Sequence, residues 1–124
     1  MKYIKTKYFH KWAKKNEITD EILSRSIKEF HDGLIDASLG HKLYKKRVAH
    51  KGKGKSGSTR TILFYEKDQK IIFCFGFAKN VNDNLDNDDK LLLYKLSKDF
   101  ESLSIKEIER LIKTGSFIEI TMEK

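Results

Sequence analysis

The spacing of apolar residues near the start of the chain is helical. Within residues 6–15 the apolar positions fall at intervals of three and four, and a second stripe continues to Leu34. Such spacing places side chains on one face of a helix. Thr19 suits the N-cap of the second segment, and Gly33 suits its stop. The pattern therefore predicts one helix within residues 6–15 and another over residues 20–32.

The pattern changes to strand-like runs after residue 41. Residues 43–49, 59–65 and 70–77 have the composition of strands. A polar connection, residues 66–69, separates the last two runs. Such a short connection joins neighbouring antiparallel strands. The sequence therefore predicts a hairpin that is preceded by another strand.

The last third of the chain returns to helical spacing. Leucine and phenylalanine recur from residue 92 to residue 103, and Ser104 with Glu107 has the pattern of a capping box. Residues 117–121 alternate as a closing strand. The predicted order of elements is α-α-β-β-β-α-α-β, and Tyr3-Ile4 allow a further short strand.

Length and composition limit the class of protein. With 124 residues, of which 39% are hydrophobic, the chain can form one packed core, so we expect a single domain over residues 1–124. Its only cysteine, Cys74, cannot form an internal disulfide. No apolar run approaches the roughly 18 residues that span a bilayer. We therefore expect a soluble protein of the cytoplasm.

The positive charge is concentrated in one segment. The chain carries 26 Lys and Arg residues against 18 Asp and Glu residues, a net charge of +8. No acidic residue lies between Asp36 and Glu66, where the cations are Lys42, Lys45, Lys46, Arg47, Lys51, Lys53, Lys55 and Arg60. A segment of one sign attracts phosphate, so it predicts a nucleic-acid partner. The alternative is a basic loop that is merely exposed.

Two familiar kinds of site are missing from the sequence. Gly54-Lys55-Ser56 resembles the end of a phosphate-binding P-loop, but Ala49 stands where that motif needs glycine. The histidines show no His-x-x-His spacing, and the sequence has no Cys-x-x-Cys pair. We therefore expect no metal site and no cofactor. The glycine-spaced lysines of residues 51–58 instead suit contact with a phosphodiester backbone.

Several strings, in order along the chain, carry a resemblance to a known family. They are TKYFHKWA (6–13), GLIDASLG (33–40), KKRV (45–48), GKGKSGSTRT (52–61) and FGFAKN (75–80). On these strings the sequence resembles the RelE/ParE superfamily of type II toxin–antitoxin toxins, in particular its HigB-like branch. The resemblance implies a RelE-like α+β fold. Two N-terminal helices would pack on a small twisted antiparallel sheet, followed by C-terminal helices and a closing strand.

The resemblance also implies a function and a partner. Toxins of this kind cleave mRNA in the ribosomal decoding site, inhibit translation and are neutralised by a co-transcribed antitoxin, here a helix-turn-helix protein. The cationic strand of the family corresponds to residues 45–47, and its arginine after the loop corresponds to Arg60. Where RelE-type members have a lysine–arginine pair and then a tyrosine, this sequence has Lys79-Asn80 and Leu85.

Cleavage of RNA without a metal uses the 2′-OH as nucleophile and needs a base, an acid and cations at the phosphate. A lysine crowded by other cations is shifted toward its neutral form, which makes Lys46 or Lys53 a candidate base, and His50 is the alternative acid or base. Arg47 and Arg60 can each grip a phosphate through two hydrogen bonds. The expected RNA-binding residues are Lys42, Tyr44, Lys45, Lys51, Lys55 and Lys79.

Aromatic residues of the first predicted helix indicate where an antitoxin binds. Tyr8, Phe9 and Trp12 form a cluster larger than so short a helix needs for anchoring. We therefore expect an antitoxin contact near Phe9 and Trp12, with ordinary core packing as the alternative. Two other functions remain open, a ParE-like toxin that acts on DNA gyrase and a basic nucleic-acid-binding module without catalysis. The acid-free segment favours the nuclease.

Overall fold

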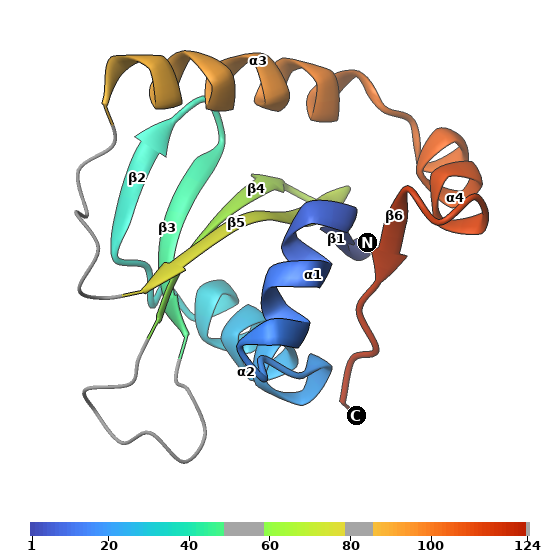
Figure 1. Cartoon of the computed structure of the whole chain (residues 1–124). Helices are drawn as coiled ribbons and strands as arrows, with labels where there is room; N and C mark the ends of the chain where they lie inside the picture. Colours follow the sequence, from blue (N-terminus) through green and yellow to red (C-terminus); the bar gives the residue numbers. More distant parts are fainter. Residues whose placement is uncertain (49–58, 79–85, 124) are drawn as a thin grey trace.

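The computed structural model describes residues 1–48, 59–78 and 86–123. The described elements are, in chain order, β1 (Lys2–Thr6), α1 (Lys7–Lys15), α2 (Asp20–His31), β2 (Ala37–Gly40), β3 (Leu43–Val48), β4 (Thr59–Glu66), β5 (Lys70–Ala78), α3 (Asn87–Ser102), α4 (Ile105–Lys113) and β6 (Phe117–Glu119). These strands form one sheet in the order β2-β3-β4-β5-β1-β6 (Figure 1).

The predicted fold class is wrong, because the sheet differs from the one expected. Instead of two N-terminal helices on a small antiparallel sheet, the chain begins with β1, which lies inside a six-stranded mixed sheet. β1 runs parallel to β5, with Tyr3 beside Ile71, and antiparallel to β6. A parallel neighbour comes from a distant segment and leaves no hairpin pattern in the sequence. From the local pattern alone, the sequence therefore predicted only a short strand at Tyr3-Ile4 in place of this inner strand.

The prediction also lacked β2, an edge strand. Its sequence, Ala-Ser-Leu-Gly, has little intrinsic preference for a strand. Its pairing with β3 shifts in register between Ser38 and Gly40, and Gly40 has a positive φ of 82° that favours glycine. The pairing with β3, and not the local sequence, therefore makes this segment a strand.

Other local predictions are confirmed. The Thr19 hydroxyl accepts a hydrogen bond from the backbone N–H of Ile22, and Gly33, at φ 92°, follows the end of α2. Ser104 and Glu107 form the predicted capping box of α4. β4 and β5 form the hairpin, and β6 is the closing strand. Signals that act within a few residues are thus reliable here.

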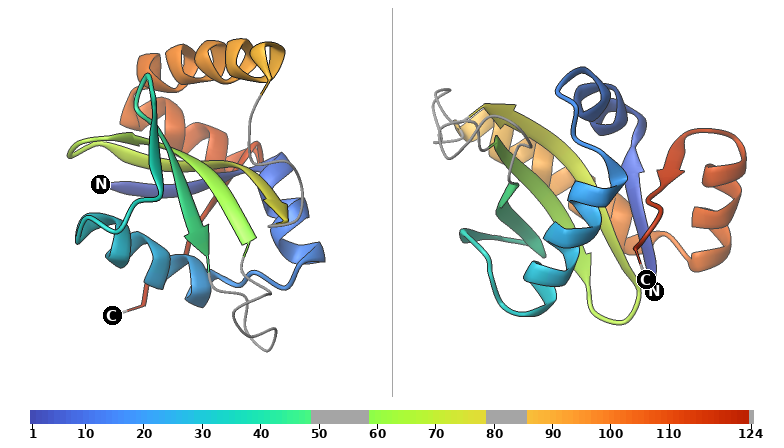
Figure 2. Two further views of the ribbon diagram at one scale, coloured as in Figure 1. Left: turned by 90° about the vertical axis from the view of Figure 1, so that its left-hand side faces the viewer. Right: turned by 90° about the horizontal axis from the view of Figure 1, so that it is seen from below.

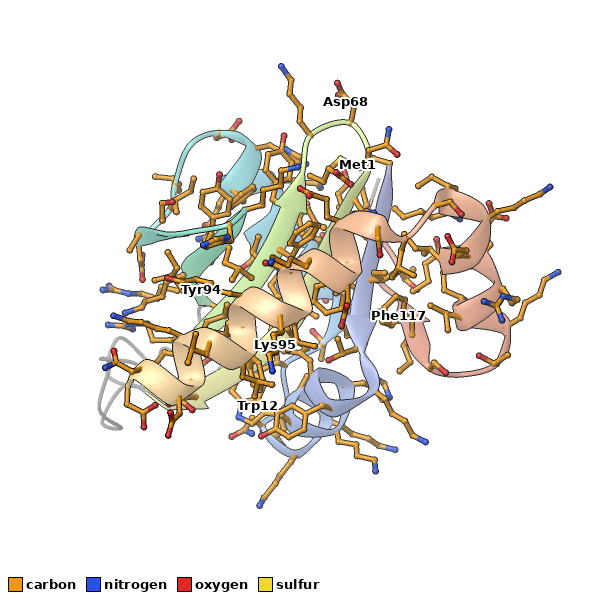
Figure 3. All side chains as sticks on the ribbon, turned by 90° about the horizontal axis from the view of Figure 1, so that it is seen from above. Met1, Trp12, Asp68, Tyr94, Lys95 and Phe117 are labelled. Carbon is orange, nitrogen blue, oxygen red and sulfur yellow. The ribbon has the colours of Figure 1, made fainter. Side chains whose placement is uncertain are left out.

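Helices cover both faces of the sheet, with α1 and α2 on one side and α3 and α4 on the other (Figure 2). Leu63 and Phe73 pack toward α1 and α2, whereas Ile62 and Phe64 pack toward α3. We call these sides the α2 face and the α3 face. Figure 3 shows α3 crossing the strands on its face. None of the described helices has both the length and the apolar character needed to cross a bilayer.

Three buried lysines fasten helices to the sheet. The amine of Lys5 lies 2.8 Å from the carboxylate of Asp20, and that of Lys46 lies 2.7 Å from Glu29, both acids being on α2. The amine of Lys70 donates to two backbone carbonyls at the end of α3, at 2.7 and 2.6 Å. A buried charge is tolerated only when it is paired in this way. These three cations therefore serve the fold.

Candidate functional site

Two arginines face each other across neighbouring strands. Arg47 of β3 lies directly opposite Arg60 of β4 in the antiparallel register. Side chains alternate between faces along a strand. Leu43, four residues before Arg47, and Ile62, two residues after Arg60, both belong to the core under α3. The two arginines therefore share the α3 face, at the end of the sheet where β3 stops and β4 begins.

The two arginines differ in exposure. Arg60 is only 7% exposed, whereas the side chain of Arg47 is 56% exposed. Burial restricts a guanidinium to few orientations, so Arg60 is held by its surroundings while Arg47 retains freedom to adjust. Like charges that lie directly opposite each other on a sheet repel. The pair therefore needs a counter-charge.

Asp36, which precedes β2, supplies that counter-charge. Its Oδ2 lies 3.8 Å from Nε of Arg60 and 4.0 Å from Nε of Arg47. The backbone N–H of Asp36 donates to the carbonyl of Lys45 at 3.0 Å, which fixes where the carboxylate can reach. The three side chains together carry one net positive charge. Such a group attracts an anion such as phosphate.

A β-bulge at Cys74 brings aromatic rings to the same face. The pairing of β4 with β5 shifts by one residue there. Because a bulge reverses the alternation that follows it, Phe75 and Phe77 pack with the α3 face, and Phe77 lies beside Arg60 in the register. Both rings are half-buried. Burial raises the pKa of the Cys74 thiol to about 12, so this cysteine stays protonated and is not a nucleophile.

The structure places two other residues of the cationic strand on the opposite face. The Lys46 amine is buried, donates to Glu29 at 2.7 Å and also contacts the carbonyl of Arg47 at 3.1 Å. The ring of Tyr44 packs edge-on against Phe30 of α2 at a centroid distance of 5.2 Å. Lys46 and Tyr44 are therefore not brought together with the arginine pair.

The remaining described lysines of this strand region lie at different distances from the arginines. Lys45 shares the α3 face with Arg47 and is half-buried. Lys42 stands at the other end of β3, where its amine contacts the carboxylates of Glu101 and Glu66. The hydrogen bond to Glu101, and next the one to Glu66, raise the pKa of Lys42. Lys42 is thus held by two acids instead of facing the arginine pair.

Several predicted site residues lie outside the described residues. They are His50, Lys51, Lys53, Lys55 and Lys79, together with Asn80 and Leu85, where the sequence departs from the family pattern. Within the described part of the chain, no group of three or more His, Cys, Asp or Glu side chains is placed to hold a metal ion.

The predicted antitoxin-binding residues occupy different depths of the molecule. Phe9 has no exposed surface and packs against Phe73 in the core. Trp12 is half-buried and covers Gly76, where a Cβ atom would lie 2.3 Å from the indole ring. Tyr8, which precedes Phe9 in the sequence, is 64% exposed, and its ring meets Phe75 edge-on. Of this cluster, Tyr8 and Trp12 are the members a partner can touch.

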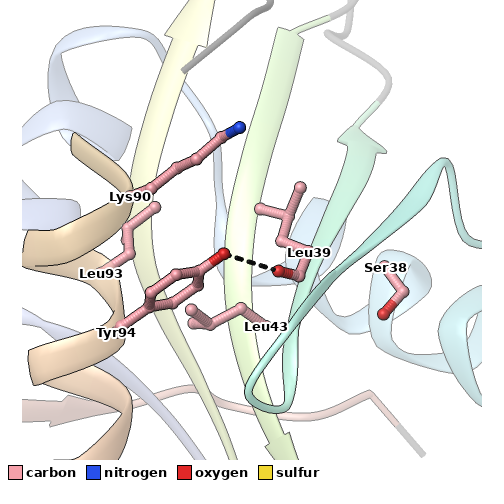
Figure 4. A pocket seen from close by; sticks show the side chains of 6 residues that line it. All are labelled: Ser38, Leu39, Leu43, Lys90, Leu93 and Tyr94. Carbon is pink, nitrogen blue, oxygen red and sulfur yellow. Dashed lines mark hydrogen bonds between the residues drawn. The ribbon is translucent and has the colours of Figure 1, made fainter. Parts of the chain in front are cut away.

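A small cavity of about 220 Å³ lies between α3 and the β2–β3 hairpin (Figure 4). Its lining residues are Ser38, Leu39, Leu43, Lys90, Leu93 and Tyr94. The Tyr94 hydroxyl donates to the carbonyl of Leu39 at 3.4 Å, and His41 stacks on the Tyr94 ring. These contacts attach the hairpin to α3.

Sequence reasoning missed Asp36 and the placement of Phe75 and Phe77. The signal for Asp36 was its position as the last acid before the cationic segment. The aromatic rings were visible as strand residues, but simple alternation would have placed them on the α2 face. A bulge has no sequence signature in this strand, so their location follows only from the structure.

Comparison with protein families identifies the chain. A family model described as the RelE toxin of the RelE / RelB toxin-antitoxin system matches residues 1–120. No curated protein matches the sequence. The matched residues include both arginines, Asp36 and the whole described sheet. RelE-family toxins pair with an antitoxin. The chain therefore belongs to the RelE toxin family and is the toxin of a toxin–antitoxin system with a cognate antitoxin.

Proposed function

We propose that this toxin is a metal-independent endoribonuclease of the HigB-like branch. It acts as one domain in the cytoplasm and cleaves mRNA bound to the ribosome, which inhibits translation. The observation that carries the proposal is the arginine pair. Arg47 and Arg60 stand opposite each other on one face of the sheet, beside the half-buried rings of Phe75 and Phe77. Cations next to aromatic rings suit a phosphate and its attached base.

The arginine pair suits the transition state of RNA cleavage. The 2′-OH attacks the adjacent phosphorus, the bond from phosphorus to the 5′-oxygen breaks, and negative charge accumulates on the phosphate oxygens. Guanidiniums stabilise this charge because their planar N–H groups bind phosphate in pairs. Arg60 is buried and so is oriented before RNA arrives, whereas the more exposed Arg47 can close on the bound phosphate.

We assign the proton transfers to the segment that connects β3 to β4. His50 and Lys53 belong to this segment, which lies between Val48 and Thr59 in the sequence, close along the chain to both arginines. Lys46 is left out of the proton transfers, because its amine donates to Glu29 on the α2 face. The expected contacts to the RNA backbone are made by Lys45, Lys51, Lys55 and Lys79.

The test compares the wild type with Arg60→Ala on ribosomes programmed with a defined mRNA. We expect Arg60→Ala to keep its circular dichroism spectrum and to cleave about 10²–10³-fold more slowly, because a donor to the developing charge is lost. Lys28→Ala, which removes an exposed cation on α2, is the control and should cleave at the wild-type rate. Free mRNA in parallel measures dependence on the ribosome.

Two outcomes would favour the other functions. Growth inhibition with intact mRNA and altered DNA supercoiling would indicate a ParE-like action on gyrase. Binding of RNA without cleavage or growth inhibition would indicate a basic binding module. Growth, mRNA integrity and DNA supercoiling are measured after expression in bacteria, and RNA binding is measured with the purified protein. Each outcome contradicts the nuclease directly.

We also propose how the antitoxin, a helix-turn-helix protein, binds. It contacts the Phe9–Trp12 region of α1, through the accessible Tyr8 and Trp12, and also covers the arginine pair. Its affinity then retains a part that is insensitive to salt, because contacts with aromatic rings are not screened by ions. Titration of the complex from low to high ionic strength measures this part. An affinity that falls as steeply with salt as RNA binding would leave only the electrostatic contact.

A further inference from the structure

Among the described residues, Asp36 is an acid whose carboxylate lies near both arginines, and the proposed chemistry gives it no role. A single oxygen, Oδ2, approaches Nε of Arg60 at 3.8 Å and Nε of Arg47 at 4.0 Å. The side chain is 31% exposed, and the backbone N–H of Asp36 is anchored to β3 through Lys45. The main chain of Asp36 is thus fixed beside β3, within reach of both cations.

The geometry makes the interaction Coulombic. Both distances are longer than a hydrogen bond, so these contacts do not use the Nε–H donors of the arginines. A carboxylate about 4 Å from a guanidinium still attracts it. The arginine pair lies partly in the protein interior, where the Coulomb attraction between opposite charges is stronger than in water. Asp36 therefore offsets the repulsion between directly opposed guanidiniums and favours one arrangement of both.

We propose that Asp36 is a positioning residue for the two phosphate-binding arginines. It acts as a built-in counter-ion that aligns the guanidiniums for catalysis and, in exchange, weakens the binding of RNA. The part of this inference that concerns catalysis rests on the proposed function. The part that concerns RNA binding depends only on the attraction between the arginine pair and a polyanion.

The proposal predicts opposite changes in binding and cleavage when the charge is removed. Without the carboxylate, one more positive charge acts on the RNA backbone and the repulsion between Asp36 and phosphate disappears. RNA should then bind more tightly. Without its counter-ion, Arg47 loses alignment with Arg60, and cleavage of bound RNA should slow, since displacement by about 1 Å can reduce a rate by about 10²-fold.

The test compares Asp36→Asn with Asp32→Asn. Asp32 is exposed at the end of α2, so the control makes the same change in net charge away from the arginines. Binding is measured with a single-stranded 2′-O-methyl RNA, which cannot be cleaved. For Asp36→Asn we expect affinity to rise about fivefold at low salt. The slope of log affinity against log salt should steepen by about 0.7. Asp32→Asn should change neither quantity.

Cleavage is measured under single-turnover conditions on programmed ribosomes. We expect Asp36→Asn to cleave at least ~10-fold more slowly although it binds RNA more tightly. Asp36→Glu, which keeps the charge, should restore part of the rate. A merely structural role predicts a lower melting temperature with weaker binding, and that result would overturn the proposal. Equal gains in affinity for Asp36→Asn and Asp32→Asn would overturn it as well.

The two proposals fail in distinguishable ways. If the wild type binds RNA but cleaves none on ribosomes, the nuclease proposal fails. The affinity comparison with the uncleavable RNA then still decides whether Asp36 restrains the arginine pair. If the wild type cleaves and Asp36→Asn cleaves equally fast, the nuclease proposal stands and the role of Asp36 is refuted.

Discussion

Lys46 and Arg47 are neighbours in sequence and carry the same charge, yet they lie on opposite faces of one strand. Lys46 is buried on the α2 face and pairs with Glu29, whereas Arg47 is half exposed on the α3 face, opposite Arg60. The alternation of a strand alone causes this difference. A run of cations in a sequence is therefore not one surface, because half of its members can belong to the core.

The acids that accompany the two cations differ as well. Glu29 meets the Lys46 amine at hydrogen-bond distance, which fixes α2 against β3. Asp36 stays about 4 Å from both arginines and serves two cations at once. One acid completes a structural ion pair with a single lysine, and the other lies near two arginines at once. We infer that the Lys46–Glu29 pair on the α2 face serves the fold and that the arginine pair on the α3 face serves the proposed reaction.

The largest expected effect comes from changing geometry without changing charge at Arg60. In Arg60→Lys the positive charge remains, but the planar pair of N–H donors is lost. We expect mRNA cleavage on ribosomes to fall about 10²-fold, while affinity for uncleavable RNA stays within about twofold of the wild type. Cleavage at the wild-type rate would mean that Arg60 supplies only charge.

The next effect concerns the α2 face near the site. In Gly76→Ala the added Cβ would meet three ring atoms of Trp12 at 2.3–2.5 Å, so α1 must shift. We expect the free energy of unfolding in urea to fall by about 1–3 kcal/mol. Trp12→Ala removes the ring, so the double variant should lose less than the sum of the single variants. Strict additivity would show that the two residues do not compete for space.

Lys46→Met measures the structural ion pair. The change removes the amine but keeps most of the side-chain volume, and it leaves Glu29, which is half exposed, in contact with water. We expect a loss of about 1–2 kcal/mol in the free energy of unfolding, discounted for that exposure. Lys28→Met, an exposed lysine on α2, is the matched control and should change stability little. Equal losses of unfolding free energy in both variants would contradict a structural role for the Lys46–Glu29 pair.

The smallest effect is a dependence of stability on acid pH. Burial alone would raise the pKa of Asp20, but hydrogen bonds from Lys5 and from the backbone of Thr121 outweigh it and lower the pKa below its ordinary value of 3.8. A lowered pKa in the folded state means that the stabilisation is complete above 3.8 and is lost as pH falls further.

Urea unfolding between pH 3 and pH 6 measures this loss. The wild type should lose stability as pH falls below about 4, and Asp20→Asn should show a shallower decline, because its side chain does not titrate. The same slope in both proteins would contradict the assignment to Asp20.

Sequence reasoning succeeded where the signal is local. Thr19, Gly33 and the Ser104–Glu107 box each act within one turn, so they mark helix ends correctly. It failed for β1, whose parallel partner β5 is more than sixty residues away in the chain. Pairing across such a distance is determined by the whole core, so no window of the sequence contains it.

The candidate site was only partly accessible to sequence reasoning for the same reason. Arg47 and Arg60 were named from charge and resemblance, and the register explains why they meet. Lys46 was grouped with them, because the sequence does not reveal which face of β3 is covered by α2. Asp36 reaches the site through the pairing of β2 with β3, and Phe77 reaches it through the bulge at Cys74, two features of tertiary structure.

The central claim is that the arginine pair on the α3 face acts on RNA and that the Lys46–Glu29 pair on the α2 face maintains the fold. The most direct test measures mRNA cleavage on programmed ribosomes and thermal unfolding for the matched variants Arg47→Met and Lys46→Met. We predict that Arg47→Met unfolds at the wild-type temperature but cleaves at least ~10-fold more slowly, whereas Lys46→Met unfolds at a lower temperature and cleaves at the wild-type rate below it. The account is contradicted if Lys46→Met, still folded, loses cleavage while Arg47→Met retains it.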